Sequence, residues 1–392
     1  MQIQLEKTLD VAVVERELAQ LWSDATHDPK AEPNADGDDA VLRARVANLL
    51  VFVSAEEALA SVHEMLQELT ARHPSRVMLM LGARDAADRD IEMFVESICQ
   101  SDKRGDNKRV SCEEITLKAY GKYVAELPSA SLPLLVSDLS TFLWWQNEPR
   151  VSDKVLDTLL RATDRLIIDS ASFANPEDDL LESNKLYGAE NYDHVGISDL
   201  NWARLTFWRE LLADFYDVGA YRATLDEIDL VEIDYVAPEQ DENSVAPQAL
   251  LFAGWLSSRL GWNFADEQSP EAQEESATLT FHFSRQPQDD AGKITVRLNR
   301  VKQGECKPGR LVRVELRSTV NEATAFTVAR SDDNLHLLAE AKLGTDTHRG
   351  RVLPVRNRST AQLLSREMEI LCNDQIYLEA LAVAAKMIDR SR

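Results

Sequence analysis

Short apolar runs separated by polar turns divide the first half of the chain into expected strands and helices. The expected strands are the runs at 46–53, 76–81, 113–119, 134–136, 142–145 and 166–169. Helical periodicity lies between them at 55–72, 120–127 and 155–163. Strands that alternate with helices pair in parallel and carry the helices on their faces. We therefore predict a Rossmann-like, three-layer α/β domain with a mostly parallel sheet.

In the second half, polar and apolar residues alternate along most of the expected strands. These strands are 231–235, 279–283, 294–301, 311–318 and 325–330, with 335–341 as a further candidate. Alternation of this kind is typical of antiparallel strands with one exposed face. Helical segments are expected at 248–260, ended by Gly261, and at 359–387. We predict an α+β domain with an antiparallel sheet and terminal helices.

These patterns give an expected domain division. Residues 1–40 hold an N-terminal helix at 11–22 and a flexible acidic linker at 27–39. The α/β domain is expected over 41–225 and the α+β domain over 226–392.

Charge and cysteine content narrow the function classes. The chain has 392 residues with 43 Lys and Arg against 67 Asp and Glu, a formal net charge of −24. Such a field repels nucleic acid and anionic membranes, so neither is an expected partner. No signal peptide or membrane-spanning run stands out, and a cytoplasmic location is expected. Cys99, Cys112, Cys306 and Cys372 are far apart and form no CxxC pair, which favours separate thiols, with a Cys99–Cys112 bridge as the alternative.

A segment rich in tryptophan and arginine follows Asp199, which can cap a helix over 199–217. An apolar stripe runs along this helix, and four residues fall partly outside it: Trp202, Arg204, Phe207 and Arg209. Trp and Arg are enriched at the hot spots of protein interfaces, so these four are candidate partner-binding residues. The alternative is that the tryptophans fill the core.

A second candidate surface is a local excess of basic residues between positions 293 and 317. The eight are Lys293, Arg297, Arg300, Lys302, Lys307, Arg310, Arg313 and Arg317. Only Glu305 and Glu315 oppose them within that window. We assign Arg310, Arg313 and Arg317 as partner-binding candidates, because a basic sheet face could dock an acidic partner or a phosphorylated metabolite. The alternative is a solvated outer face whose charges discourage aggregation.

Motifs for cofactors and catalysis are missing from the sequence. No glycine follows the run at 46–53, and neither GxGxxG nor GxxxxGK[ST] occurs, so no nucleotide cofactor is expected. GxSxG and HExxH are also absent, and we assign no catalytic or metal-binding residue. The competing hypothesis is a sugar-phosphate- or nucleotide-binding enzyme, with Ser75 and Arg76 of the HPSR tetrapeptide as a phosphate site. That enzyme would use aspartates at expected strand ends, namely Asp138, Asp164 and Asp169.

Several longer motifs in order carry a family resemblance. They are VANLLVF at 46–52, HPSRVMLML at 73–81, FLWWQNEP at 142–149, ATDRLIIDS at 162–170, DLNWARLTFWRELLADFYD at 199–217 and QALLFAGWLSSRLGW at 248–262. Together they resemble the OpcA family of glucose-6-phosphate dehydrogenase assembly proteins, over about Val41 to Ala382.

The resemblance implies a non-catalytic assembly factor and allosteric activator that binds glucose-6-phosphate dehydrogenase directly. The dehydrogenase performs the oxidation that produces NADPH in the oxidative pentose phosphate pathway. The family occurs chiefly in cyanobacteria and actinobacteria. Control by thioredoxin is implied for cyanobacterial members, whereas only Cys372 lies in the C-terminal region of this chain.

Overall fold

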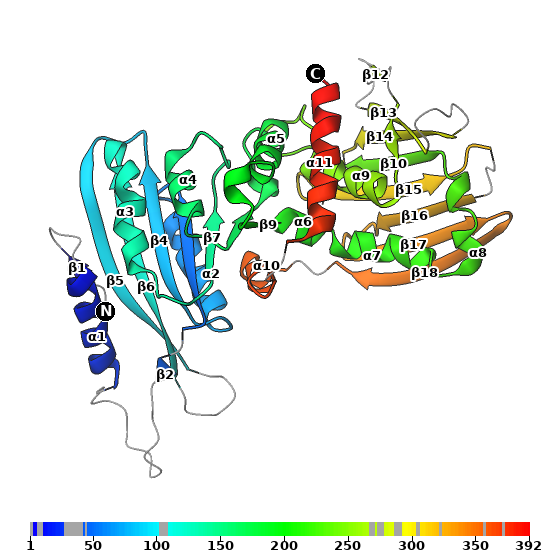
Figure 1. Ribbon diagram of the computed structural model, residues 1–392. Helices are drawn as coiled ribbons and strands as arrows, with labels where there is room; N and C mark the ends of the chain where they lie inside the picture. Colours follow the sequence, from blue (N-terminus) through cyan, green and yellow to red (C-terminus); the bar gives the residue numbers. More distant parts are fainter. Residues whose placement is uncertain are drawn as a thin grey trace, which may run out of the picture. The chain divides into compact units, whose positions relative to one another are not determined.

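Two β-sheets organise the computed structural model, one in each of two units of the chain (Figure 1). The first unit comprises Met1–Ile168, Ala189–Ser198 and Arg358–Asn373, and the second comprises Asp169–Gly188, Asp199–Asn357 and Asp374–Arg392. The structure describes residues 3–5, 11–26, 42–43, 45–101, 109–265, 271–272, 278–285, 292–302, 306–320, 324–355, 358–370 and 373–392. The expected linker at 27–39 lies outside the described residues.

The first sheet is mostly parallel, as expected. Its strands are β1 (Ile3–Leu5), β2 (Leu42–Arg43), β3 (Ala47–Val53), β4 (Ser75–Ala83), β5 (Arg89–Ser101), β6 (Arg109–Tyr120), β7 (Thr141–Trp145), β8 (Arg165–Ile168) and β9 (Gly196–Asp199). The strand order is β1-β5-β6-β4-β3-β7-β8-β9, with β2 beside β6. Strands β6, β4, β3, β7 and β8 pair in parallel, whereas the unexpected strand β5 is antiparallel to both β6 and β1.

The helices of the first unit are α1 (Val11–Thr26), α2 (Ala58–Thr70), α3 (Leu127–Ser131), α4 (Lys154–Leu160) and α10 (Thr360–Glu367). Helix α3 packs against β4 and β6, and α1 packs against β5. The predicted strand at 134–136 is wrong, because a 3₁₀ turn spans Leu132–Leu134 and the two residues after it belong to no strand. The side chain of Asn48, instead of a neighbouring strand, bonds both the N–H and the C=O of Val136, at 2.9 and 3.0 Å.

The central strands of the first sheet are buried along nearly their whole length. All residues of β3, β7 and β8 are buried, and in β4 only the last residue is not. Trp145 stacks on Phe52 with ring centroids 4.0 Å apart. Both faces of these strands are therefore covered, which is usual for parallel sheets.

The second sheet is mostly antiparallel. Its strands are β10 (Leu230–Tyr235), β11 (Asn263–Phe264), β12 (Glu271–Ala272), β13 (Thr278–Ser284), β14 (Lys293–Arg300), β15 (Leu311–Arg317), β16 (Thr324–Arg330), β17 (His336–Leu343) and β18 (Asp346–Pro354). The order β11-β13-β14-β10-β15-β16-β17-β18 inserts β10 between β14 and β15. Strand β10 is parallel to β14, so the expected antiparallel pairing is wrong at this position.

Helices cover one face of the second sheet. They are α5 (Pro176–Tyr187), α6 (Leu200–Arg204), α7 (Thr206–Phe215), α8 (Gly219–Arg222), α9 (Pro247–Arg259) and α11 (Gln375–Arg390). Helix α9 packs on β10, α7 packs on β16 to β18, and α11 lies against α9 (Figure 1). The predicted single helix over 359–387 is wrong, because α10 ends at Glu367 and α11 begins at Gln375, where Asp374 caps it.

The opposite face of the second sheet is open in the described part of the chain. Along β10, the side chains of Val231, Ile233 and Tyr235 are buried, whereas Glu232 and Asp234 between them are half-buried. The arginines that pair with these two carboxylates, Arg297, Arg313 and Arg317, are 36 to 43% exposed. The second sheet is therefore apolar toward its helices and polar on its other face.

Candidate functional site

The tryptophan- and arginine-rich segment is two helices instead of one. Asp199 caps the first as predicted, accepting a hydrogen bond from Asn201 N at 2.8 Å. Helix α6 ends at Arg204, and α7 begins at Thr206 after the fully buried Leu205. The break places Trp202 and Arg204 where they bind partners distant in sequence.

Those partners remove Trp202 from the surface. The indole N–H of Trp202 donates to Asp374 Oδ2 at 2.8 Å, and its ring packs near Tyr377. The guanidinium of Arg209 stacks over the Trp202 ring at 3.4 Å. Trp202 is only 4% exposed, so its side chain is part of the core of the second unit.

Arg204 forms a two-bond ion pair inside the second unit. Its two terminal nitrogens donate to the two carboxylate oxygens of Asp169 at 2.6 and 2.7 Å. Both side chains are less than a fifth exposed, and the pair fixes the loop after β8. Arg204 is therefore a structural residue here, and Phe207 and Arg209 are half-buried beside it.

Ser75 and Arg76 are buried inside the first unit. The Arg76 guanidinium is 2% exposed and donates to Glu113 at 2.8 Å, to Glu15 at 2.6 Å and to the backbone oxygen of Leu134 at 2.7 Å. The Ser75 hydroxyl donates to His73 O at 2.9 Å. The Arg76 guanidinium is therefore paired with two carboxylates in the interior of the first unit.

Two of the three strand-end aspartates have structural partners. Asp164 accepts a hydrogen bond from Thr141 N at 2.7 Å, and Asp169 is bound by Arg204. Asp138 lies in a turn with a left-handed backbone, φ 65°.

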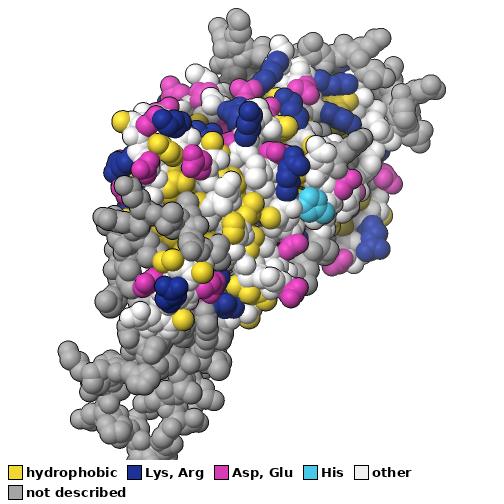
Figure 2. Space-filling view, turned by 60° about the vertical axis from the view of Figure 1, so that its left-hand side comes forward, with side chains coloured by type: hydrophobic (Ala, Val, Ile, Leu, Met, Phe, Trp, Pro, Cys, Tyr) yellow, Lys and Arg dark blue, Asp and Glu magenta, His cyan; other side chains and the backbone are white. Residues whose placement is uncertain are grey.

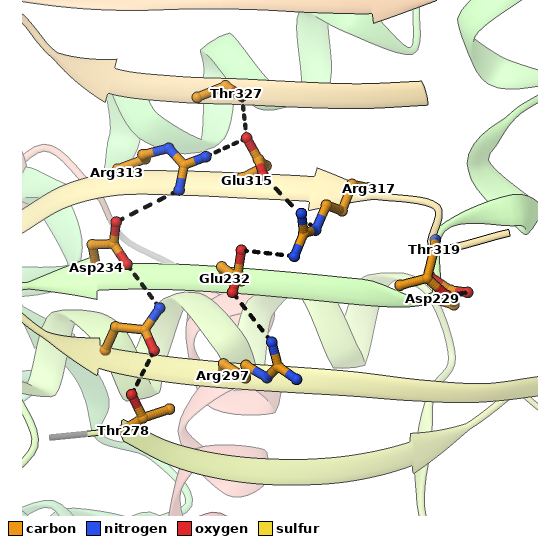
Figure 3. Close-up of polar contacts among 11 residues, drawn as sticks. Asp229, Glu232, Asp234, Thr278, Arg297, Arg313, Glu315, Arg317, Thr319 and Thr327 are labelled. Carbon is orange, nitrogen blue, oxygen red and sulfur yellow. Dashed lines mark hydrogen bonds and ion pairs between the residues drawn. The ribbon is translucent and has the colours of Figure 1, made fainter. Parts of the chain in front are cut away.

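The open face of the second sheet carries a network of alternating charges, which we call the charged ladder. Its members are Glu232 and Asp234 on β10, Arg297 on β14, and Arg313, Glu315 and Arg317 on β15. Figure 3 shows these side chains linked across the three strands. Arg297 and Arg317 both reach Glu232, at 3.5 and 3.4 Å.

The upper part of the charged ladder centres on Arg313. This guanidinium lies 3.7 Å from Asp234 and also bonds Glu315, which accepts from Thr327 Oγ1 at 3.0 Å (Figure 3). The carboxylates are 13 to 18% exposed and the arginines 36 to 43%. The arginines therefore form the outer layer of the network.

Acidic residues neutralise the basic face that the sequence predicts. The window from 293 to 317 misses Glu232 and Asp234, because β10 comes earlier in the chain and is inserted between β14 and β15. Three arginines thus face three carboxylates. Arg313 and Arg317 lie on the exposed face as predicted, but that face is mixed in charge instead of basic.

An apolar strip continues the same face beyond Arg313. Strand pairing places Arg313 opposite Ala329, Ala329 opposite Leu338, and Leu338 opposite Val352. Residues directly opposite each other in a sheet share a face. Leu338 is 41% and Val352 56% exposed, so a charged network and exposed apolar side chains lie next to each other.

The two cysteines whose surroundings are described, Cys112 and Cys306, are buried. Cys112 donates to the backbone oxygen of Thr70 at 3.7 Å, so it is not bridged to Cys99. Burial raises the pKa of the Cys306 thiol. Reactive thiols are exposed, whereas both of these side chains are buried.

The surface charges, the groups able to bind metal and the lengths of the helices indicate no further site within the ranges that the structure describes. Figure 2 shows acidic and basic side chains interspersed, with hydrophobic side chains between them, on the face in view. Among the described residues, no group of three or more His, Cys, Asp or Glu side chains could hold a metal ion. Within the same part of the chain, every helix is too short or too polar to cross a membrane.

These features define a two-unit α/β protein with a mostly parallel first sheet and a mostly antiparallel second sheet. A family model described as glucose-6-phosphate dehydrogenase subunit N-terminal domain matches residues 66–185, and the corresponding C-terminal domain matches residues 195–381. The chain belongs to the OpcA family of proteins associated with glucose-6-phosphate dehydrogenase, which confirms the resemblance read from the sequence.

Relatives from cyanobacteria bear the same family name. The chain is 29% identical over 338 residues to the OxPP cycle protein OpcA of Nostoc punctiforme, covering 85% of this chain and 70% of the relative. It is 28% identical over 335 residues to the protein of that name in Synechocystis sp., covering 83% of this chain and 66% of the relative. The matched part is thus about two thirds of the length of these relatives.

Some solved structures have a distant similarity. An aldose-aldose oxidoreductase from Caulobacter crescentus is 9% identical with a TM-score of 0.44, covering 89% of this chain and 98% of that one. An oxidoreductase domain protein from Kribbella flavida is 9% identical with a TM-score of 0.47, covering 88% of this chain and 97% of that one. Values this low transfer neither a reaction nor a cofactor.

Proposed function

We propose that this protein is a non-catalytic assembly factor and allosteric activator that binds glucose-6-phosphate dehydrogenase directly. The observation that carries the proposal is the pair of family models, both described as parts of a glucose-6-phosphate dehydrogenase subunit and together spanning most of residues 66–381. The described contacts of Arg76, Asp164 and Asp169 add support, because these candidates for a catalytic site are occupied by structural partners.

We further propose that the dehydrogenase docks on the charged ladder and the adjoining apolar strip. Protein interfaces combine an apolar centre with a polar rim, and arginine is enriched in them. Leu338 and Val352 supply exposed apolar surface, and Arg313 borders it. The alternating charges favour a partner surface of complementary alternating charge, which fixes orientation more than it adds affinity.

Activation requires only a modest preference for one state of the partner. A binder shifts a conformational equilibrium by its difference in affinity for the two states. A tenfold shift toward an active conformation or oligomer needs about 1.4 kcal/mol of that difference. One or two side chains at the centre of an interface can provide it.

The test combines the purified chain with its cognate dehydrogenase and follows both elution volume and NADPH production. The key variant is Leu338→Asp, which places a charge in the apolar strip. Val320→Asp is the matched control, since Val320 is a 92% exposed apolar residue that follows β15 in the sequence. We expect the unchanged chain and Val320→Asp to shift the elution and raise the rate, and Leu338→Asp to weaken both effects about tenfold.

Two results would contradict the proposal at different levels. If Leu338→Asp acts like the unchanged chain, the docking surface is wrong. If a saturating amount of the unchanged chain leaves both elution and rate as they were, the assembly role is wrong. Turnover of a sugar phosphate by the chain alone would instead support the enzyme hypothesis.

A further inference from the structure

A small cavity in the second unit has a basic wall that the assembly role does not use. Its volume is about 180 Å³, and its walls come from the loop after β8, the turn after β10, the start of α9 and the turn before β15. Lys307 and Arg310 line it, with Glu239 as its acidic side chain and Ser170 and Gly309 among its small residues. The walls therefore carry an excess of positive charge in a protein of net charge −24.

The guanidinium of Arg310 has no carboxylate of its own in the described part of the chain. The nearby Asp169 is held through both oxygens by Arg204, and Arg330 donates to Leu311 O at 2.6 Å. No described residue forms an ion pair or side-chain hydrogen bond with Arg310. Burial, and then the charge of Arg204, lowers the pKa of Arg310 to about 10, and the opposing charge of Asp169 offsets this only in part.

The start of helix α9 also favours an anion in this cavity. Pro247 is the first residue of the 13-residue helix and lines the cavity. The first turn contains no acidic residue, and no side chain caps it. Pro247 has no N–H, and the N–H groups of Ala249 and Leu250 donate to Ala246 O at 2.9 and 3.3 Å, so the contribution of this turn is the positive end of the helix dipole.

We propose that this cavity binds the phosphate group of a small phosphorylated metabolite, with Arg310 and Lys307 as the anion-binding side chains. Arginine and lysine both bind phosphate through charged hydrogen bonds, and arginine can do so with two parallel bonds. The volume is below the several hundred Å³ typical of pockets for drug-sized ligands, so the cavity admits a small phosphate ester and excludes a polymer. This site goes beyond the proposed function and is independent of it, because it requires no dehydrogenase.

The experiment measures binding to the isolated full chain by calorimetry and by the shift in melting temperature. The probes are glucose 6-phosphate, inorganic phosphate and, as the uncharged control, glucose. We expect both phosphates to bind and to raise the melting temperature, and glucose to do neither. If glucose 6-phosphate binds more tightly than inorganic phosphate, the cavity walls also contact the sugar. If the two bind equally, only the phosphate group is recognised.

Three variants locate the site. Arg310→Gln and Lys307→Gln should each weaken phosphate binding about tenfold, because each removes a charged contact. Lys302→Gln is the matched control, since Lys302 is an exposed lysine of the same unit outside the cavity wall, and it should bind as the unchanged chain does. Lys307 is exposed, so its variant keeps the test decisive if Arg310→Gln fails to fold.

The proposal is overturned if neither phosphate binds at millimolar concentration. It is also overturned if glucose binds as well as its phosphate ester, or if Lys307→Gln and Lys302→Gln bind phosphate equally well.

Discussion

The two sheets of this protein treat charged side chains in opposite ways. In the first, Arg76 and Glu113 pair at 2.8 Å with both side chains buried. In the second, Arg317 lies 3.4 Å from Glu232 with its side chain 41% exposed. In the first sheet the ion pair neutralises two buried charges, whereas in the second the ion pairs lie on an open face. The comparison indicates that the second unit is the place to look for partners and ligands.

The largest loss of stability is expected from breaking the buried ion pair of Arg76 and Glu113. Arg76→Leu leaves the Glu113 carboxylate in the interior, where it also pairs with Arg45, and removes the donor to Leu134 O. Removing one partner of a buried ion pair costs about 3–5 kcal/mol, because the other charge stays buried. Denaturant unfolding should show a loss of free energy of unfolding of this size. Arg72→Leu, at an exposed position of the same unit, should change it little, and a loss no larger than in this control would contradict the structural role of Arg76.

A substitution in the helices that cover the second sheet should lower the stability nearly as much. A Cβ on Gly254 of α9 would lie 2.2 Å from the backbone oxygen of Ala380 in α11. Gly254→Ala must therefore push the two helices apart, at a cost of about 1–3 kcal/mol typical of overpacked cores. Gly219→Ala is the matched control, since no atom lies within 4 Å of its Cβ. Equal melting temperatures of the two variants would show that α9 and α11 are not in close contact.

A buried carboxylate makes the stability of the second unit depend on pH. Complete burial, followed by the charge of Asp169, raises the pKa of Asp199 to about 6 from its ordinary value of 3.8. Between these two values the folded state binds more protons than the unfolded state, so the free energy of unfolding falls as the pH rises. The fall should be about 2–3 kcal/mol over this window. Asp199→Asn should remove that slope, and a variant with the same pH profile as the unchanged chain would place the pKa of Asp199 near its ordinary value.

The smallest effect is expected on the open face. Arg317→Gln breaks the contact with Glu232 in the charged ladder. Exposed ion pairs contribute about 0–1 kcal/mol, because water and salt screen them. Arg317→Gln should therefore lower the melting temperature much less than Arg76→Leu does. A comparable loss in both would mean that the charged ladder is a structural network and not an open surface.

The sequence predicts the features that depend on local pattern. The alternation of Val231, Glu232 and Ile233 identifies a half-buried strand, and Gly261 ends helix α9 with a left-handed backbone, φ 65°. The apolar runs of β3, β4, β7 and β8 identify the mostly parallel first sheet. The family resemblance rests on long motifs, and the family models confirm it.

Other features depend on contacts between distant segments. Nothing within 199–217 predicts the break at Leu205, because Asp374 and Asp169, the partners of Trp202 and Arg204, lie elsewhere in the sequence. The burial of Arg76 depends on Glu113, 37 residues away. The mixed charge of the open face depends on the insertion of β10 next to β15, which strand patterns alone do not reveal. A search for carboxylates on every expected strand of the sheet would have shown that Glu232 and Asp234 could oppose the arginines.

Chemical footprinting of the complex tests the central claim most directly. Arginine and carboxyl reagents, read out by mass spectrometry with and without the dehydrogenase, would report the accessibility of the charged ladder and of exposed residues elsewhere. We predict protection of Arg297, Arg313 and Arg317 on binding, with Arg72 and Arg161 of the first unit still labelled. Unchanged labelling of the three ladder arginines in a saturated complex would contradict the claim that the open face of the second sheet receives the dehydrogenase.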